Sequence, residues 1–273
     1  MAKEIRYFYT PNVQLGELPQ DEAQHVLRVL RMGVGDELNL MDGQGTFYRA
    51  EITTATGHRC LYRIVEEQPQ ERAWNGSICL AMAPTKLNDR TEWFVEKATE
   101  IGIDEFAFLD CQFSERRTLK VDRIEKIVVS GMKQSHKAWK PLVDQMTSFK
   151  NFVETDRPGQ KFICHCYDQC DIEKISQQDF EKDAAEFSKS CSGIFEFANG
   201  EKISQHKPHL KDVLNALDEP CTVLVGPEGD FSVDEVRLAQ QHGYRSVSLG
   251  TSRLRTETAA LVATHIMQLI KQK

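Results

Sequence analysis

The chain has 273 residues, of which 40% are hydrophobic and 27% charged, a composition typical of a globular protein. No apolar run approaches the roughly 18 residues of a membrane span, so the sequence excludes a membrane-embedded protein. The formal net charge of −7 at pH 7 excludes a uniformly basic surface for nucleic acids, but it leaves room for a local basic patch.

The amino terminus is charged where a secretory signal would be apolar, so we expect a cytoplasmic protein. Eight cysteines are scattered along the chain, and without an export signal we expect them to be reduced thiols. Their one cluster, Cys164, Cys166 and Cys170, lacks the paired C-x-x-C spacing of a zinc site, so no metal is expected. We expect Phe162, Cys164 and Cys166 to share one face of a strand instead.

The first 72 residues have the pattern of a small β-rich domain. Asp21 and Gln24 match a capping box, which predicts a helix that stops near Gly33. Strands and a hairpin turn follow. The strands are predicted over 37–40 and 46–52, and the turn at 42–43.

A polar stretch with a Pro, residues 66–72, is predicted as a linker, and the domain boundary is placed at its end. From residue 73 to residue 273 strands and helices alternate, which predicts an α/β fold on a parallel sheet of at least five strands. The strands are predicted over 78–83, 106–109, 162–166, 222–225 and 246–249. The helices are predicted over 90–101, 123–137, 233–242 and 257–270. The weakly patterned stretch 168–206 is interpreted as a polar segment and a candidate insertion.

Helix starts carry further signals. Asn88 or Asp89 is predicted to cap the first helix of this unit, which should end at Gly102. Asp122 with Glu125 matches a capping box at the start of the second.

A glycine-rich turn, Gly226-Pro227-Glu228-Gly229, follows the strand 222–225, and Ser232 with Glu235 then opens a helix as a capping box. Ligands bind at such turns in open α/β sheets, because glycine lets the backbone approach and the helix start offers free N–H groups. An ordinary strand-to-helix turn is the alternative. The motif lacks the G-x-G-x-x-G and Walker patterns of nucleotide folds.

A second turn follows the strand 246–249, and Thr256 is predicted as the N-cap of the last helix. This helix has apolar or small residues around most of its circumference, which indicates burial on more than one side. A subunit interface would supply the second side, so we expect a homodimer. Burial inside a monomer is the alternative.

The two turns together resemble the signature of the ribosomal RNA uridine-N3 methyltransferases in the SPOUT superfamily. The matching segments are Gly226-Pro227-Glu228-Gly229, Leu249-Gly250 and Leu254-Arg255-Thr256-Glu257-Thr258-Ala259. Similarity extends through residues 25–31 and 96–102. The resemblance implies a PUA-like β-barrel followed by an α/β domain whose carboxyl end forms a trefoil knot. It also implies methyl transfer from S-adenosylmethionine to N3 of a uridine in 16S rRNA, on the assembled small ribosomal subunit.

In this family the two turns bind the cofactor at a dimer interface. The implied cofactor-binding residues are Leu224, Val225, Gly226, Pro227, Glu228, Gly229, Leu249, Gly250, Leu254, Arg255 and Thr256. For catalysis, Arg255 could stabilise the uracil anion and Glu257 could accept the N3 proton, but Glu257 could equally stabilise the helix start. Asp230 stands where the family usually has a second glycine, a departure that could perturb the cofactor loop.

Basic residues are concentrated between positions 115 and 150, a segment that contains nine Lys or Arg and only four Asp or Glu. On a helical wheel the basic residues of 123–137 share one stripe and the apolar ones another, so the charges should face outward. We predict RNA phosphate contacts for this stripe, and a solvated face is the alternative. With the first domain included, the predicted RNA-binding residues are His25, Arg28, Arg31, Arg116, Arg123, Lys126, Lys133 and Lys137.

Two other functions fit the same sequence. One is a non-catalytic RNA-binding or ribosome-assembly protein, which cofactor binding would distinguish. The other is a knotted enzyme that methylates a ribose 2′-oxygen, which the identity of the modified atom would distinguish.

Overall fold

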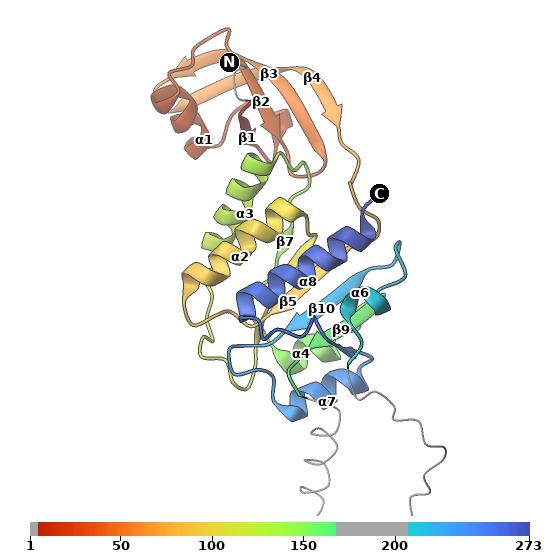
Figure 1. The fold of residues 1–273 in the computed structure, drawn as a ribbon. Coiled ribbons are helices and arrows are strands. Elements are labelled where there is room, and N and C mark those ends of the chain that lie inside the picture. Colours follow the sequence, from red (N-terminus) through yellow and green to blue (C-terminus); the bar gives the residue numbers. More distant parts are fainter. Residues whose placement is uncertain (1–4, 168–206) are drawn as a thin grey trace, which may run out of the picture.

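The computed structural model describes residues 5–167 and 207–273, which form two sheets and the helices around them (Figure 1). The candidate insertion 168–206, with Cys170, lies outside the described residues. In the described parts of the chain, no helix is both long and apolar enough to cross a membrane.

The first sheet has four strands in the order β1-β2-β3-β4. They are β1 (Tyr7–Tyr9), β2 (Glu37–Met41), β3 (Thr46–Thr56) and β4 (Arg59–Pro69). Strand β1 runs parallel to β2, and the two later pairs are antiparallel. This confirms the β-rich first unit and its hairpin, while the barrel that the resemblance implies stays an expectation.

The predicted first helix is present, but its start differs. Helix α1 (Gln20–Gln24) begins after Pro19, without a side-chain cap, and continues into a π-helical turn over His25–Val29. The capping box at Asp21 was therefore wrong, because Asp21 already lies in the first helical turn, where an acidic side chain favours the helix dipole.

The predicted linker was also placed too early. Strand β4 continues to Pro69, at the edge of the first sheet. Residues 65–69 are exposed there, so the alternation that identifies a half-buried strand is missing from the sequence. After the strand, Arg72 forms an ion pair with Asp104 and lies over the ring of Trp139, 4.6 Å from its centroid.

The second sheet has the strand order β11-β9-β10-β5-β6-β7, with β8 also paired to β6. All its pairings are parallel, which confirms the predicted α/β class. The strands are β5 (Ile78–Met82), β6 (Glu105–Asp110), β7 (Leu142–Val143), β8 (Thr147–Ser148), β9 (Gln160–Cys164), β10 (Cys221–Val225) and β11 (Arg245–Val247). Strands β5 and β10 are buried along their whole length, as expected of central parallel strands covered on both faces.

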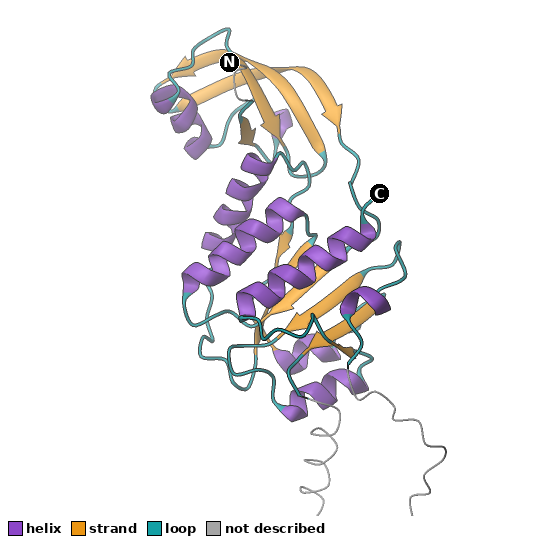
Figure 2. Ribbon diagram, in the orientation of Figure 1, coloured by secondary structure: helices purple, strands orange, loops and turns teal. Residues whose placement is uncertain are grey.

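Helices cover both faces of this sheet (Figure 2). One apolar cluster joins alternate residues of β5 and β10 to α2 (Asn88–Ile101), α3 (Val121–Ser135), α6 (Leu210–Val213) and α8 (Thr256–Lys271). The intervening residues of the same strands pack with α4 (Phe149–Glu154) and α7 (Val233–Gln241). Helices α2 and α8 lie side by side on one face (Figure 1).

Three of the predicted helix starts need correction. The N-cap positions are held by Leu87 in α2, Lys120 in α3 and Arg255 in α8, none of which caps the helix with its side chain. The capping box of Ser232 with Glu235 is confirmed, with both of its hydrogen bonds present. Gly102 ends α2 as predicted, at a φ of 118° that favours glycine.

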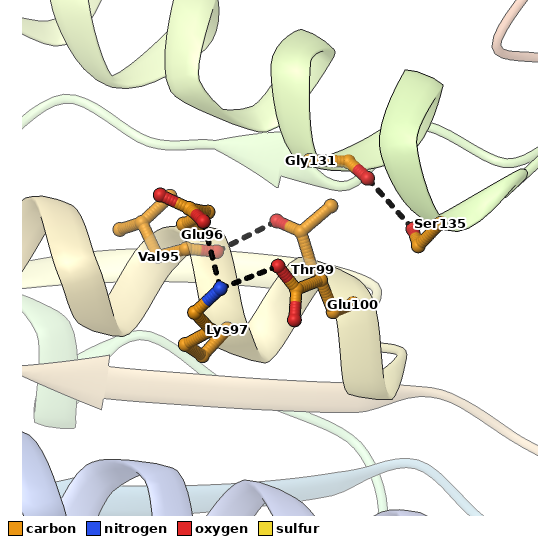
Figure 3. A network of polar contacts seen from close by, with 7 residues as sticks. All are labelled: Val95, Glu96, Lys97, Thr99, Glu100, Gly131 and Ser135. Atoms are coloured by element: carbon orange, nitrogen blue, oxygen red, sulfur yellow. Dashed lines mark hydrogen bonds and ion pairs between the residues drawn. The ribbon is translucent and has the colours of Figure 1, made fainter. Parts of the chain in front are cut away.

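Helix α2 packs closely against α3 near its carboxyl end, opposite the end that borders the candidate site. A Cβ on Gly131 of α3 would lie 3.2 Å from the side chain of Thr99, so a side chain at position 131 would crowd this contact. The Thr99 hydroxyl turns back to the carbonyl of Val95, and Lys97 bonds both Glu96 and Glu100 (Figure 3).

Candidate active site

The two glycine-containing turns lie at the same edge of the second sheet. Val225, at the end of β10, and Val247, at the end of β11, are both paired with Cys164 of the intervening strand β9. Two strand spacings therefore separate the ends, about 10 Å. Met82, at the end of β5, pairs with Val225 from the other side. The segments that follow β5, β10 and β11 thus meet at the carboxyl edge, where open α/β sheets bind ligands.

Asp230 supports the first turn and does not disturb it. Its backbone adopts a φ of 68°, a left-handed conformation that Asp tolerates better than most residues. One carboxylate oxygen accepts a hydrogen bond from the amide of Phe231, and the other accepts one from the amide of Cys166, both at 2.8 Å. The departure from glycine is therefore accommodated, and it ties the turn to the end of β9.

The turn is also tied to the start of α2. Oε1 of Glu228 accepts a hydrogen bond of 2.9 Å from the amide of Lys86. Within the turn, a Cβ on Gly226 would lie 3.0 Å from the backbone nitrogen of Phe231, so a side chain here would crowd the turn itself.

Gly250 has a different environment. Its φ is 131°, which strains any other residue, and a Cβ there would meet nothing within 4 Å. Its amide donates a hydrogen bond of 3.1 Å to the Ser248 hydroxyl oxygen. The space beside this backbone is open, as a loop that a ligand approaches requires.

A pocket of about 630 Å³ opens between the starts of α2 and α8. Arg90 and Trp93 line it from α2, and Arg253, Arg255 and Glu257 line it from the other side. Its size lies within the range of small-molecule sites.

Glu257 is the most constrained side chain of this pocket. The residue is 7% exposed, and its Oε1 lies 3.8 Å from Nε of Arg90. Its Oε2 is buried without a hydrogen-bond partner among the described residues. An unpaired buried acceptor is costly, so a donor is expected here when the site is occupied.

The predicted cofactor residues fall into two groups. Leu224, Val225, Gly226 and Pro227 are buried, so they can offer a ligand little beyond backbone atoms. Residues with exposed or partly exposed surface at the same edge are Glu228, Gly229, Leu249, Gly250, Leu254 and Arg255. Thr256 is buried in the first turn of α8.

The end of β9 differs from the expectation for its cysteines. Cys164 packs in the same apolar cluster as Phe162, as expected, whereas strand β9 ends at Cys164 and Cys166 is exposed beyond it. His165 between them is buried and contacts the Ser246 hydroxyl at 2.8 Å. Burial and the nearby Lys207 ammonium lower the pKa of His165 to about 3. Residues 5–167 and 207–273 contain no group of three side chains placed to hold a metal ion.

Only part of the basic stripe predicted on α3 is free to contact RNA phosphate. The apolar stripe is confirmed, since Ile124, Val128 and Met132 are buried. Lys126 is exposed as predicted. Lys133, however, bonds both carboxylate oxygens of Glu22 in the first unit. Lys133 was predicted to contact phosphate, but in the structure its ammonium group is engaged in an ion pair.

Three more basic residues are engaged or shielded. Arg123 pairs with Glu92 of α2 at 2.5 Å. Arg116 donates to the backbone carbonyl of Lys86 at 2.6 Å, which places it beside the active-site edge. Lys137 lies beyond the end of α3 and is partly buried, which lowers its pKa.

In the first unit, the predicted basic residues lie on and just after the π-helical turn. Arg28 and Arg31 are exposed, and a guanidinium nitrogen of Arg28 lies 3.1 Å from both ring nitrogens of His58. His25 is partly buried, with its ring against Phe8. Both arginines are therefore accessible, Arg28 on the turn and Arg31 just after it.

Arg90 and Trp93 were missed from the sequence. The sequence did contain a signal for them, because both residues follow the predicted strand 78–83, and the carboxyl ends of parallel strands lie at one edge of a sheet. Sequence alone did not show that β5 would be the neighbour of β10.

Comparison with known proteins agrees with this arrangement. A family model described as an RNA methyltransferase domain matches residues 72–190 and 160–268, and one described as an RNA methyltransferase PUA domain matches residues 18–65. The chain belongs to this RNA methyltransferase family. The family resemblance expected from the two turns is therefore confirmed.

Individual relatives of this methyltransferase chain cover almost its whole length. A crystal structure of a probable rRNA-methyltransferase from Porphyromonas gingivalis is 34% identical, covers 98% of each chain and superposes with a TM-score of 0.78. Ribosomal RNA small subunit methyltransferase E of Bacillus subtilis is 26% identical over 89% of this chain and 85% of its own length. A structure of the protein with that name from Neisseria gonorrhoeae, bound to S-adenosylmethionine, has the same fold, with 24% identity, 97% and 98% coverage and a TM-score of 0.74.

Proposed function

We propose that this protein transfers a methyl group from S-adenosylmethionine to N3 of a uridine in 16S rRNA, on the assembled small ribosomal subunit. The observation that carries the proposal is the buried Oε2 of Glu257, which has no hydrogen-bond partner among residues 5–167 and 207–273 and belongs to a residue that lines the pocket. Relatives named ribosomal RNA small subunit methyltransferase E support the substrate.

The residues present fit the cofactor. The backbone of Gly250 faces open space, and Glu228 and Gly229 are exposed at the neighbouring turn, so a ligand can approach both loops. We assign the cofactor to these loops, with Leu249 and Leu254 offering apolar surface. When bound, S-adenosylmethionine supplies an electrophilic methyl group, whose bond to sulfur breaks with its electron pair left on sulfur as the bond to N3 forms.

Side chains of the protein then accept the N3 proton and stabilise the negative charge on the uracil. Uracil N3 holds its proton at neutral pH, so methylation requires an acceptor close to it. We assign this role to Oε2 of Glu257, while Arg90 orients the carboxylate through Oε1 at 3.8 Å. The guanidinium of Arg255, exposed at the same pocket, stabilises the charge that develops on the uracil oxygens.

Three features of the assembly belong to the same proposal. We place the domain boundary at residue 72, since the first sheet ends at Pro69 and the second begins at Ile78. A trefoil knot is supported by the path from β11, at the sheet edge, to α8, which packs on the central strands β5 and β10. A homodimer through α8 is supported by Leu269, which is 59% exposed on that helix.

The test uses small subunits that lack the modification and a cofactor with a radiolabelled methyl group. We expect label in 16S rRNA with the wild-type protein, and a rate lower by about two orders of magnitude or more with Glu257→Gln, as for other lost general bases. Binding of the cofactor by the variant should be unchanged. A protein that binds no S-adenosylmethionine would instead be a non-catalytic member of the family.

A further inference from the structure

We infer that the pocket between α2 and α8 binds the target base, with the Trp93 indole stacked on it and Oε2 of Glu257 selecting uridine over cytidine. This inference rests on the proposed function and adds to it the way in which the base is held and recognised. Three observations carry it: the exposure of Trp93, the charges around it and the unpaired carboxylate oxygen.

Trp93 faces away from the core that the rest of its helix builds. Its neighbours Phe94 and Val95 are fully buried, whereas Trp93 is 43% exposed and lines the pocket. A single exposed aromatic residue needs no explanation by itself. Trp93, however, lines the same pocket as Glu257, and an unstacked base is typically stacked on an aromatic side chain while its edge is hydrogen-bonded.

The charges of the pocket suit a nucleotide. Arg90, Arg253 and Arg255 line a cavity of about 630 Å³ together with Asp89 and Glu257, so three guanidinium groups outnumber two carboxylates there. Guanidinium groups contact phosphate well, because their donors match its oxygen geometry. A cavity of this size has room for one nucleotide and not for a duplex. The target therefore enters as a base taken out of its stack.

Oε2 of Glu257 would distinguish uridine from cytidine. At its N3 position uracil carries a hydrogen, which can donate to Oε2 of Glu257. Cytosine has no hydrogen on N3 and presents a lone pair there. A cytidine in the same pose would leave a buried acceptor facing another acceptor, and buried polar groups without partners are what allows an enzyme to reject a close analogue.

The experiment measures binding and turnover separately. The probes are a short single-stranded RNA with one uridine and its matched cytidine version, added to protein saturated with S-adenosylmethionine. Binding is followed by tryptophan fluorescence, since stacking on a base quenches an indole. Trp74 is buried, and the Trp93→Phe variant shows how much of the signal comes from Trp93. Leu142→Ala, an exposed apolar position on β7, is the control.

We expect the uridine RNA to quench the fluorescence of the wild type and of the Leu142→Ala variant but not that of Trp93→Phe, which lacks the indole. Trp93→Ala should raise KM for small subunits roughly ten- to hundredfold, the usual effect of a lost base stack, with a smaller change in kcat. Glu257→Gln should remove the preference for uridine RNA over cytidine RNA, since an amide offers both a donor and an acceptor.

Three results would overturn the inference. If Trp93→Ala keeps the wild-type KM, the indole does not hold the base. If it loses S-adenosylmethionine binding, the pocket belongs to the cofactor. If it changes the sedimentation coefficient, Trp93 belongs to a subunit interface. A wild-type protein that methylates no rRNA would contradict the proposed function, whereas normal methylation with an unaffected Trp93→Ala variant contradicts only this inference.

Discussion

Lys133 of α3 donates to both carboxylate oxygens of Glu22 in the first unit, at 2.6 and 2.9 Å. Glu22 also accepts a hydrogen bond from the backbone amide of Tyr9 at 3.3 Å. Because the side chains of Lys133 and Glu22 are mostly shielded from water, with 26% and 12% exposure, this pair connects the two parts of the chain and is poorly placed to bind phosphate.

Two lysines of α3 should therefore behave differently. We expect Lys133→Met to lower the free energy of unfolding by about 1 to 2 kcal/mol, because it breaks a shielded pair of charged hydrogen bonds, and to leave the salt dependence of RNA binding unchanged. Lys126→Met should leave stability unchanged and lower the salt slope by roughly 0.7 to 0.9 unit. Urea unfolding and filter binding over a salt series measure both effects. Equal loss of slope in the two variants would contradict the assignment of Lys133.

The open loop at Gly250 predicts a loss of cofactor binding without loss of the fold. Gly250→Ala forces a Cβ onto a backbone with φ of 131°, at a strain of about 1 to 3 kcal/mol, so the loop should shift and S-adenosylmethionine affinity fall at least tenfold by calorimetry. Gly35→Ala, at a φ of 89° and also in open space, is the matched control. If both variants bind the cofactor like the wild type, the loop does not contact it.

His165 predicts a sensitivity to acid. Burial lowers its pKa to about 3, below the roughly 6.5 of an unfolded histidine. The folded state therefore takes up this proton less readily, so the stability it contributes is present above pH 6.5 and is lost as the pH falls toward 3. Between pH 7 and pH 5 the loss should be about 2 kcal/mol. In urea unfolding at both pH values, His165→Gln should show a smaller difference; an unchanged difference would mean that His165 stays accessible to protons.

The exposed face of α8 predicts the oligomeric state. Leu269 is 59% exposed there, and a leucine at the centre of a subunit interface does not tolerate a charge. The wild type should sediment at about twice 31.2 kDa, and Leu269→Arg should sediment as a monomer. Leu142→Arg, at a position 66% exposed on β7, should remain a dimer. A monomeric wild type at micromolar concentration would rule out the interface.

Periodic patterns predicted five strands of the second sheet and its longer helices, because each of these elements shows its buried face in its own sequence. The two-residue strands β7 and β8 were missed, since they are too short to show a pattern. In α3, the buried positions Ile124, Val128 and Met132 show such a pattern. The same wheel showed only that Lys133 points away from that core. It could not show that Glu22, 111 positions earlier, would meet it, since a local pattern does not contain the packing of distant segments.

The candidate site shows the same limit. Both turns could be placed at the carboxyl edge because each follows a predicted strand. The role of Arg90 and Trp93 required the strand order, which puts β5 next to β10. The capping signal at Asp122 failed because the helix begins one residue earlier, at Val121, with Lys120 at the N-cap.

The most direct test of the account is the identity of the methylated atom. Small subunits without the modification would be incubated with the protein and S-adenosylmethionine, and the 16S rRNA digested to nucleosides for mass spectrometry against standards. We predict one new nucleoside, N3-methyluridine, that is absent with Glu257→Gln. A 2′-O-methylated nucleoside, or no methylation by protein that binds the cofactor, would contradict a site built around the unpaired oxygen of Glu257.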